Sequence, residues 1–513
     1  MKDSVIKGNG NSRYLKSSLE GITTWEQFRD ALAAGTLPVD LNGINPEGFQ
    51  QLGDPLNKAT LLKDDTAEKY GLGDNALVDD AFKFLAPGKL ATITVTTTLG
   101  ATVTCTDGFL TLTKKADEVI CVFHVKLGTW TIKARLGEED SGEHTVVVST
   151  LGDYAVFAPT VEKVYGVVWD GSSSTLLTRT DRAAGFTNPV AYMAGLSSYG
   201  SPFDNIMPWS GMTVVDDAEA GKLVKIPKFW YKLTQNGNSV EIRIADAPLY
   251  GFSVSPAHMD RGDGKGERDV VYVGRYHCRS SDYKSYGGSA PKNNITRSSA
   301  RSGIHAFGST VWQSDFLMAF TIWLLYIVEY ANWNSQEVIG YGCGNSSGVQ
   351  SMGYTDSMPY HTGTTLASRD SYGLGTQYRN IEGLWDNCFD WMDGCYYNSN
   401  GMMVILNPSA FSDSSGGVLV GKPTNGWIGA LRVKTVSGLP PLFIPSGASG
   451  GNSTYVPDYW FYDASRPCLA RGGNYDRNRD RGMFYVSYGS VSDASASVGC
   501  RLMKLPDKEE NAA

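Results

Sequence analysis

The chain has 513 residues, which exceeds the size of one hydrophobic core and predicts roughly two to four domains. Apolar residues make up 42% and charged residues 19% of the chain, a balance typical of folded globular proteins. The net charge of −8 argues against a nucleic-acid partner, because contacts to phosphates require a basic surface.

Two segments bear on export and on membranes. The opening residues, MKDSVIKGNGNSRYL, lack the apolar centre of a secretory signal peptide. The longest apolar run, 316–328, is shorter than the roughly 20 residues that a membrane-spanning helix needs, and Glu329 ends it. We therefore expect a buried helix over about 314–333 and no insertion into a membrane.

The eight cysteines have no Cys-x-x-Cys spacing, which argues against a zinc site and against a redox motif. Because no export signal is visible, we expect buried free thiols. A disulfide between Cys105 and Cys121 is the alternative.

Residues 1–88 predict a small N-terminal module of short helices and extended segments. Thr23 and Glu26 form a capping box at the start of a helix that Gly35 ends. Two further helices are expected after Asp65 and over 75–85. This segment has too little apolar material for a strong core of its own, so we expect it to attach to a partner or to associate with copies of itself.

Residues 89–163 predict a small antiparallel β-sandwich. Short alternating or β-branched runs follow one another at close spacing, separated by turns rich in Gly, Asp and Lys. The predicted strands are 91–98, 101–106, 108–114, 118–126, 128–136, 143–150 and 153–159. The pattern resembles the immunoglobulin-like spacer modules of bacterial surface and phage proteins.

Residues 164–508 predict one larger and less regular domain. Strands are expected at 164–171, 222–235, 240–246, 426–434 and 498–503. The tripeptide Arg261-Gly262-Asp263 matches the sequence that integrins recognise, but we interpret it as part of a charged loop.

The segment 471–493 has the composition of a binding surface. Apart from Met483, Phe484, Val486 and Val491, its residues are Arg, Gly, Asn, Tyr, Asp or Ser. Tyr provides large contact area at low entropic cost, Ser and Asn provide adaptable hydrogen bonds, and Arg provides forked donors. The alternative is an ordinary polar loop without a special role.

Three blocks in this region resemble a known family: GLWDNCFDW at 383–391, ARGGNY at 470–475 and GCRLM at 499–503. Their order resembles the C-type lectin fold, in the branch shared by formylglycine-generating enzymes and the variable proteins of diversity-generating retroelements. The segments 225–233, 358–364 and 378–391 are also similar to tail adhesins of phages that infect gut bacteria, and the opening segment resembles the start of phage tail proteins.

The resemblance implies a multidomain α+β chain: a helical and extended N-terminal module, an immunoglobulin-like β-sandwich and a C-terminal C-type-lectin-like domain. It also implies that receptor-binding positions lie between the second and third blocks, with Phe484, Val486 and Val491 holding the frame. One sequence leaves open whether the segment is actively diversified. The implied displayed positions are Asn474, Tyr475, Asp476, Arg477, Arg479, Arg481, Tyr485, Ser487, Tyr488, Ser490 and Ser492.

No enzyme is indicated. Formylglycine-generating enzymes bind copper with two close cysteines, whereas Cys468 and Cys500 are far apart in this sequence. The six histidines lack metal-ligand spacing. We interpret Asp386, Asp390 and Asp393 as structural polar residues rather than calcium ligands. No catalytic residue, metal or cofactor is therefore expected.

The resemblance implies a phage tail fibre or receptor-binding adhesin at the tail tip of the virion, assembled in the host cytoplasm. The expected partner is a bacterial surface protein or glycan, and the N-terminus is expected to bind other tail proteins. Tyr475, Tyr485 and Tyr488 would be aromatic anchors, and a homotrimer would raise avidity. An envelope-degrading depolymerase and a purely structural tail protein are the alternatives.

Overall fold

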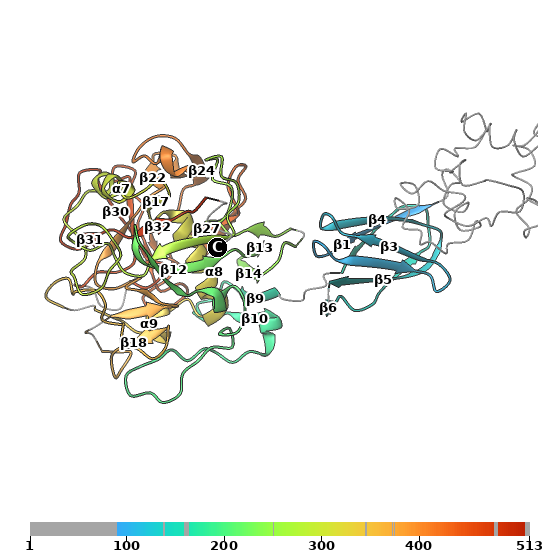
Figure 1. Cartoon of the computed structure of the whole chain (residues 1–513), viewed down its shortest axis with the longest axis horizontal. Helices are drawn as coiled ribbons and strands as arrows, with labels where there is room; N and C mark the ends of the chain where they lie inside the picture. The colour runs from blue at the N-terminus through green and yellow to red at the C-terminus, as the bar shows by residue number, and fades with distance from the viewer. Residues whose placement is uncertain are drawn as a thin grey trace, which may run out of the picture. The chain divides into compact units, whose positions relative to one another are not determined.

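The computed structural model describes residues 90–136, 139–158, 164–249, 251–343, 346–371, 373, 375–476 and 481–507. The chain divides into two compact units, Met1–Glu162 with Ala247–Tyr250, and Lys163–Asp246 with Gly251–Ala513 (Figure 1). The helices expected within 1–88 lie outside the described residues.

The first unit contains a β-sandwich. One sheet has the order β4-β1-β8, and the other has the order β3-β2-β5-β6 with β7 paired to β5. Each of the seven strands expected from the sequence is present. The bounds are β1 (Ala91–Thr96), β2 (Thr102–Thr106), β3 (Thr111–Lys115), β4 (Ile120–Val125), β5 (Gly128–Leu136), β6 (Glu139–Asp140), β7 (His144–Val148) and β8 (Asp153–Phe157).

Alternation of side chains explains the sandwich. In β1, Ala91, Ile93 and Val95 are buried, and the threonines between them are partly exposed. The buried faces of both sheets form one core around Trp130. Cys105 and Cys121 lie in different sheets of this core as free thiols, and all eight cysteines are buried and free, so the expectation of free thiols is confirmed.

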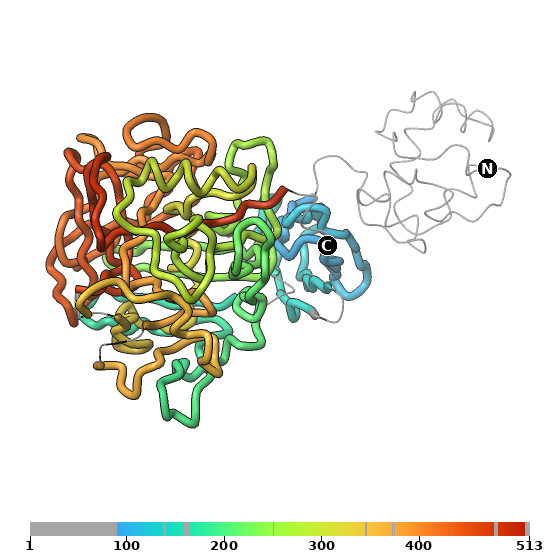
Figure 2. Tube along the Cα trace, turned by 60° about the vertical axis from the view of Figure 1, so that its left-hand side comes forward, coloured from blue at the N-terminus to red at the C-terminus, as the bar shows by residue number. Residues whose placement is uncertain are grey.

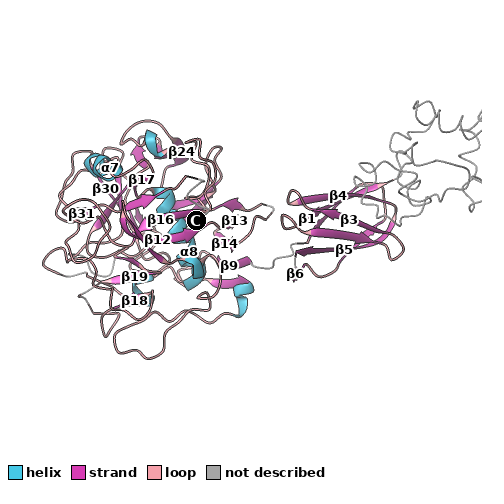
Figure 3. Cartoon of the chain, viewed as in Figure 1, coloured by secondary structure: helices cyan, strands magenta, loops and turns pink. Residues whose placement is uncertain are grey.

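The second unit is also built mainly of strands, and helices are few among its described residues (Figure 3). Two five-stranded sheets have the orders β10-β9-β14-β13-β15 and β11-β12-β16-β32-β17. Their strands are β9 (Val164–Trp169), β10 (Thr178–Asp181), β11 (Val214–Asp217), β12 (Gly221–Pro227), β13 (Trp230–Asn236), β14 (Ser239–Ala245), β15 (Ser253–Val254), β16 (Val270–Gly274), β17 (Val311–Gln313) and β32 (Leu502–Lys504).

A six-stranded sheet with the order β25-β28-β30-β29-β21-β31 carries the three sequence blocks. Its strands are β21 (Phe389–Met392), β25 (Gly426–Trp427), β28 (Tyr459–Trp460), β29 (Cys468–Arg471), β30 (Val486–Gly489) and β31 (Val498–Gly499). The smaller sheets contain β18 (Gly363–Thr364), β19 (Thr376–Tyr378), β20 (Ile381–Glu382), β22 (Cys395–Asn398), β23 (Gly401–Val404), β24 (Val418–Gly421), β26 (Ala430–Lys434) and β27 (Leu442–Gly447).

The predicted buried helix is confirmed as α8 (Phe316–Tyr330), all of whose residues are buried. Asp315 caps its N-terminus by accepting a hydrogen bond from the backbone N–H of Met318, and α8 lies among the strands of the larger unit (Figure 3). In the part of the chain that the structure describes, no helix is long and apolar enough to cross a membrane. The other helices are α7 (Arg297–His305), α9 (Ser335–Val338) and the 3₁₀ turns η2 (Arg182–Gly185), η3 (Trp209–Gly211) and η4 (Pro408–Ala410).

Three sequence expectations for strands need correction. The segment 222–235 forms β12 and β13, which belong to different sheets. The segment 426–434 forms β25 and β26, which belong to different sheets. The closing segment 498–503 is likewise not one strand: β31 ends the six-stranded sheet, and β32 lies between β16 and β17 in another sheet. The chain leaves the six-stranded sheet at Cys500 and Arg501, and the Arg501 side chain is fully buried. In Figure 2 the final red stretch of the chain runs among yellow-green segments, in keeping with the place of β32 between β16 and β17.

The integrin-like tripeptide lies in a loop, as expected, but its arginine is buried in the scaffold. Arg261 is fully buried, forms an ion pair with Asp315 and donates from Nε to the Leu406 carbonyl oxygen at 2.8 Å. Because Asp315 also caps α8, Arg261 fixes the start of the central helix.

Candidate functional site

A single buried carboxylate joins the three sequence blocks. Asp390, in the first block, accepts hydrogen bonds from Nη2 of Arg471 at 3.3 Å and from Nε of Arg501 at 3.0 Å. These arginines belong to the second and third blocks. His277 Nδ1 lies 2.6 Å from the other carboxylate oxygen. Burial would raise the pKa of Asp390, but His277, Arg501 and Arg471 hold it well below its usual range.

Arg501 also satisfies the backbone around it. Nη1 donates to the carbonyl oxygens of Gly274 and Arg275, and Nη2 donates to those of Glu382 and Gly383. A guanidinium has five N–H donors in a fixed fork, so it can bind a carboxylate and several carbonyl groups at once. Arg501, which lies between β31 and β32, thus links this part of the chain to the segments 274–275 and 382–383.

The glycines of the second block allow close packing against the first. A Cβ atom on Gly472 would lie 2.3 Å from the carbonyl oxygen of Leu384, and Gly472 has φ of +72°. A Cβ atom on Gly473 would lie 2.2 Å from the carbonyl oxygen of Trp385. Only glycine fits at such approaches without displacement of the backbone.

Both ends of the segment that follows are held. Arg481 Nη1 donates to Oδ1 of Asn474 at 2.9 Å, and the backbone N–H of Tyr475 donates to the Asn387 carbonyl oxygen at 3.0 Å. On the far side, Asp458 accepts hydrogen bonds from the backbone N–H groups of Gly482 and Phe484. Residues 477–480, between these anchors, lie outside the described part.

Side chains alternate between the two faces of the six-stranded sheet. Met392, Leu469 and Val486 join the main hydrophobic core of the unit. Phe389 and Tyr485 belong to a separate small cluster together with Trp391, Cys468 and Ala470. The sheet therefore separates the main core from a second apolar layer.

We define the aromatic cluster as Phe389, Trp427, Tyr459, Phe461, Tyr485 and Tyr488. Its ring centroids are 5.6 Å apart for Trp427 and Tyr459, and 4.2 Å apart for Tyr459 and Phe461. Phe461 continues to Tyr488 at 5.1 Å and to Tyr485 at 6.0 Å, and Tyr485 lies 5.9 Å from Phe389. Trp427, Tyr459, Phe461 and Tyr488 are only half-buried.

Two guanidinium groups stack on this aromatic cluster. The guanidinium carbon of Arg481 lies 5.0 Å from the ring centroid of Phe389 and 4.9 Å from that of Tyr485. Arg466, which is exposed, lies 5.2 Å from the ring centroid of Tyr488. All three distances are within the range of cation–π attraction. The result is a surface with flat aromatic faces and stacked cations, suited to non-covalent binding.

The predicted displayed positions divide into four groups, of which one is buried. Asp476 and Ser492 are exposed, and Tyr475, Arg481, Ser487, Tyr488 and Ser490 are half-buried. Arg477 and Arg479 lie outside the described residues.

The expectation of display is wrong for Asn474 and Tyr485, whose exposed fractions are 3% and 2%. The carboxamide of Asn474 is turned inward to Arg481, and the Tyr485 ring is enclosed by Phe389, Phe461 and Arg481.

The three positions that were expected to hold the frame differ in their burial. Phe484 and Val486 are buried, as expected, but Val491 is 48% exposed and does not hold the frame. The hydroxyl of Ser490 donates to Asp493 Oδ1 at 2.7 Å, and the backbone N–H of Asp493 donates to the Ser490 carbonyl oxygen at 3.1 Å. This turn places Val491 and Ser492 at its tip, where no neighbouring strand covers them.

Sequence reasoning missed Trp427, Tyr459 and Phe461, which lie outside 471–493. The signal was present in the run DYWFYD at 458–463. In this run Trp460 is buried in the main core, whereas Tyr459 and Phe461 contact the other layer.

Asp386 and Asp390 of the first block and the nearby Asp393 have separate partners within the protein. Asp386 accepts from the backbone N–H of Thr376 at 2.8 Å, and Asp393 forms an ion pair with Arg301. Asp390 binds the two arginines described above. Within the described ranges, no group of three or more His, Cys, Asp or Glu side chains is arranged to hold a metal ion.

No protein-family model matches the sequence, and no curated protein sequence matches it. Among solved structures, the chain is similar to three variants of Major Tropism Determinant, named U1, M1 and P3c, with 11%, 11% and 9% sequence identity. Each alignment covers 73% of this chain and 80% of the other, with TM-scores of 0.21, 0.23 and 0.22. At TM-scores this low, the likeness carries no argument about the fold or the function of this chain.

Proposed function

We propose that the chain is a phage tail adhesin that binds a bacterial surface receptor without covalent chemistry. Its binding surface would consist of the half-buried members of the aromatic cluster, Arg466, Arg481 and the expected displayed positions Tyr475, Asp476, Arg477 and Arg479. The aromatic cluster is the observation that carries this proposal. Aromatic and arginine side chains at the centre of a patch contribute most of the binding energy at many protein interfaces.

The scaffold around Asp390 supports a role in display. Asp390, Arg471 and Arg501 are buried, both arginines form ion pairs with Asp390, and Gly472 packs directly on the first block. None of these contacts depends on the side chains of Tyr475 or Asp476. The tip of this segment can therefore change in sequence while its ends stay fixed, which is what a variable receptor-binding surface requires.

We also propose three domains, 1–88, 89–163 and 164–508, with a C-type-lectin-like fold for the last. The adjacency of β21, β29 and β31 in one sheet supports this fold, because those strands carry the three family-like blocks in their expected order. A homotrimer bound at the tail tip through 1–88 would raise the avidity of weak individual sites.

Binding of the purified full chain to a panel of gut bacterial strains tests the proposal. We expect saturable binding to at least one strain, and an affinity at least about tenfold lower for Tyr459→Ala and for Arg466→Ala, equivalent to about 1.4 kcal/mol. Leu176→Ser is the matched control, because Leu176 is 58% exposed in the same unit and lies outside the aromatic cluster.

The alternatives give different results in the same assay. Equal binding by all variants would reject the aromatic cluster as the receptor surface. Release of surface polysaccharide from the cells would favour the depolymerase. A folded chain that binds no cells but binds purified tail proteins would favour a structural role.

A further inference from the structure

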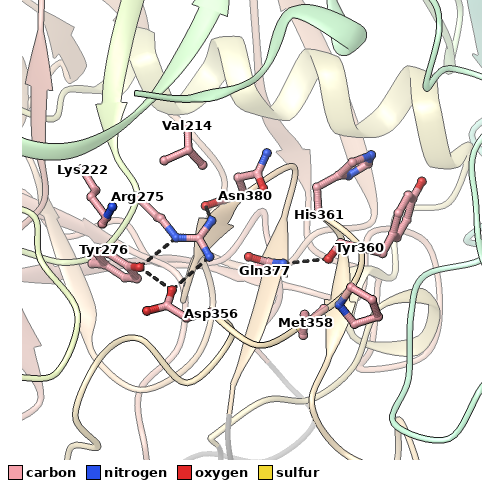
Figure 4. Close-up of a pocket in the computed structure, with 11 residues that line it drawn as sticks. Val214, Lys222, Arg275, Tyr276, Asp356, Met358, Tyr360, His361, Gln377 and Asn380 are labelled. Carbon is pink, nitrogen blue, oxygen red and sulfur yellow. Dashed lines mark hydrogen bonds and ion pairs between the residues drawn. The ribbon is translucent and has the colours of Figure 1, made fainter. Parts of the chain in front are cut away.

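A second candidate site lies in the larger unit, in an open pocket of about 490 Å³. This volume is within the range of roughly 300–1,000 Å³ that is typical of small-molecule sites. None of the residues of the aromatic cluster lines the pocket, so it is independent of the proposed receptor surface. Figure 4 shows its lining residues, which are Val214, Lys222, Arg275, Tyr276, Asp356, Met358, Pro359, Tyr360, His361, Gln377 and Asn380.

Hydrogen bonds within the pocket fix its polar groups in place. Arg275 donates from Nε to the Tyr276 hydroxyl at 2.9 Å, from Nη1 to the Asn380 carbonyl oxygen at 3.0 Å and from Nη2 to Asp356 Oδ1 at 3.1 Å. The Tyr276 hydroxyl donates to the same oxygen of Asp356 (Figure 4). A site whose donors and acceptors are already oriented loses little entropy when it binds a ligand.

The second side of the pocket is fixed in the same way. Gln377 Nε2 donates to the Tyr360 carbonyl oxygen at 2.9 Å, and the Tyr360 hydroxyl donates to Asp204 Oδ2 at 2.8 Å. His361 Nε2 lies 3.0 Å from Oδ1 of the same carboxylate. Tyr360 and His361 are therefore both held by Asp204, and their ring centroids lie 4.0 Å apart.

The charges in the pocket are paired. Arg275 is neutralised by Asp356, and Lys222 Nζ lies 2.9 Å from Oδ1 of Asp216. Because each of these two cations already has a carboxylate partner, neither is left unpaired to attract a charged ligand. The pocket thus favours an uncharged ligand.

Hydrogen-bonding capacity nevertheless remains toward solvent. The side chain of Asp356 is 52% exposed and that of Lys222 is 40% exposed, so both an acceptor and a donor are accessible. Met358, Pro359 and Val214 add apolar surface beside them. Adjacent donors, acceptors and apolar faces match a sugar ring, in which each hydroxyl both donates and accepts and the C–H face is apolar.

We propose that this pocket binds a neutral saccharide unit through Asp356, Lys222 and the apolar side chains beside them. This site extends the proposed function to a second contact with a glycan, but it does not depend on that function. A chain that fails to bind cells could still bind a sugar in this pocket, and a chain that binds cells could fail to bind a sugar here.

Saturation-transfer NMR on the full chain tests the pocket with four free sugars: D-glucose, D-galactose, D-mannose and N-acetyl-D-glucosamine. We expect signals from at least one sugar and at least tenfold weaker binding by Asp356→Asn, which keeps the shape of the side chain. Lys222→Met is a second variant that leaves the Arg275 network intact, and it should also weaken binding. Leu176→Ser should bind as the unchanged chain does.

Two further probes, inorganic phosphate and acetate, test the inference about charge. Binding of either anion in competition with the sugars would overturn the proposal of a neutral ligand. Absence of a signal from all four sugars would overturn it as well, as would unchanged sugar binding by both pocket variants. Thermal unfolding of each variant shows that a loss of binding is not a loss of folding.

Discussion

The Nε atom of Arg501 lies 3.0 Å from Oδ2 of Asp390, and both side chains are buried. Asp390 belongs to β21, and Arg501 lies at the break between β31 and β32. The pair therefore ties two sheets together at a point far from solvent. Arg471 and His277 bind the same carboxylate, so the loss of Asp390 would leave two buried arginines without their countercharge.

The first prediction concerns this buried ion pair. We expect Asp390→Asn to lower the free energy of unfolding by about 3–5 kcal/mol, because Arg471 and Arg501 would stay buried without their carboxylate. Urea unfolding monitored by tryptophan fluorescence measures the change. The exposed pair of Lys265 and Asp507 provides the control, and Lys265→Met should change stability far less, because solvent screens an exposed ion pair. Similar effects of the two substitutions would contradict a central role for Asp390.

Stability should also fall on acidification. Burial would raise the pKa of Asp204, but hydrogen bonds from His361 and Tyr360 and the charge of Arg379 lower it to about 2. The pKa of Asp390 is also lowered. Both carboxyl groups have a lower pKa in the folded chain than the value of about 3.9 in the unfolded chain. The stabilisation that these two groups provide is therefore complete above about pH 3.9. It is lost as the pH falls from about 4 toward 2.

Calorimetric unfolding temperatures between pH 7 and pH 3 test this dependence. Asp204→Asn removes one of the two titrating groups, so its unfolding temperature should depend less on pH over the acid range than that of the unchanged chain. An identical acid slope in the variant would show that Asp204 does not contribute.

The contact between the glycine pair and the first block predicts a steric effect. Gly472→Ala should destabilise the chain by more than the roughly 1–2 kcal/mol that a positive φ costs an alanine, because its Cβ would lie 2.3 Å from the Leu384 carbonyl oxygen. Gly264→Ala is the matched control: its φ is +79°, and no atom lies within 4 Å of its added Cβ. Equal unfolding free energies for the two variants would indicate that the close approach has no energetic weight.

The buried thiols should react slowly in the folded chain. Burial raises the pKa of Cys105 to about 12 and that of Cys468 to about 11, so neither forms the reactive thiolate at pH 8. A chromogenic disulfide reagent should modify them only after unfolding in urea, and then detect eight thiols per chain without a reductant. A count of six under these conditions would reveal a disulfide.

Local patterns were sufficient for some of the regular elements. The alternation of apolar and polar residues in 91–96 depends on the period of two of a β-strand, and β1 follows it. The apolar run at 316–328 could be buried on all sides only inside a large domain, and α8 is. In both cases neighbouring residues in the sequence carry the information.

The three family-like blocks were visible in the sequence, but the reason that they belong together was not. Asp390, Arg471 and Arg501 are separated by long stretches of chain and meet only through the pairing of β21 with β29 and β31. The number of residues between them in the sequence does not give their distance in the folded chain. A polar aspartate in an aromatic block could equally have been a surface residue or a cation ligand.

The binding surface was decided by the tertiary structure. The composition of 471–493 correctly marked Tyr475, Asp476 and Ser492 as accessible or partly accessible, but it could not indicate that Asn474 and Tyr485 turn inward. Those two side chains are buried because Arg481 folds over them. Composition alone treats Asn474, Arg481 and Tyr485 alike, as displayed residues, and does not show that they contact one another. Tyr459 and Phe461 join the surface because β28 pairs with β30, and only the folded sheet brings them beside Tyr485 and Tyr488.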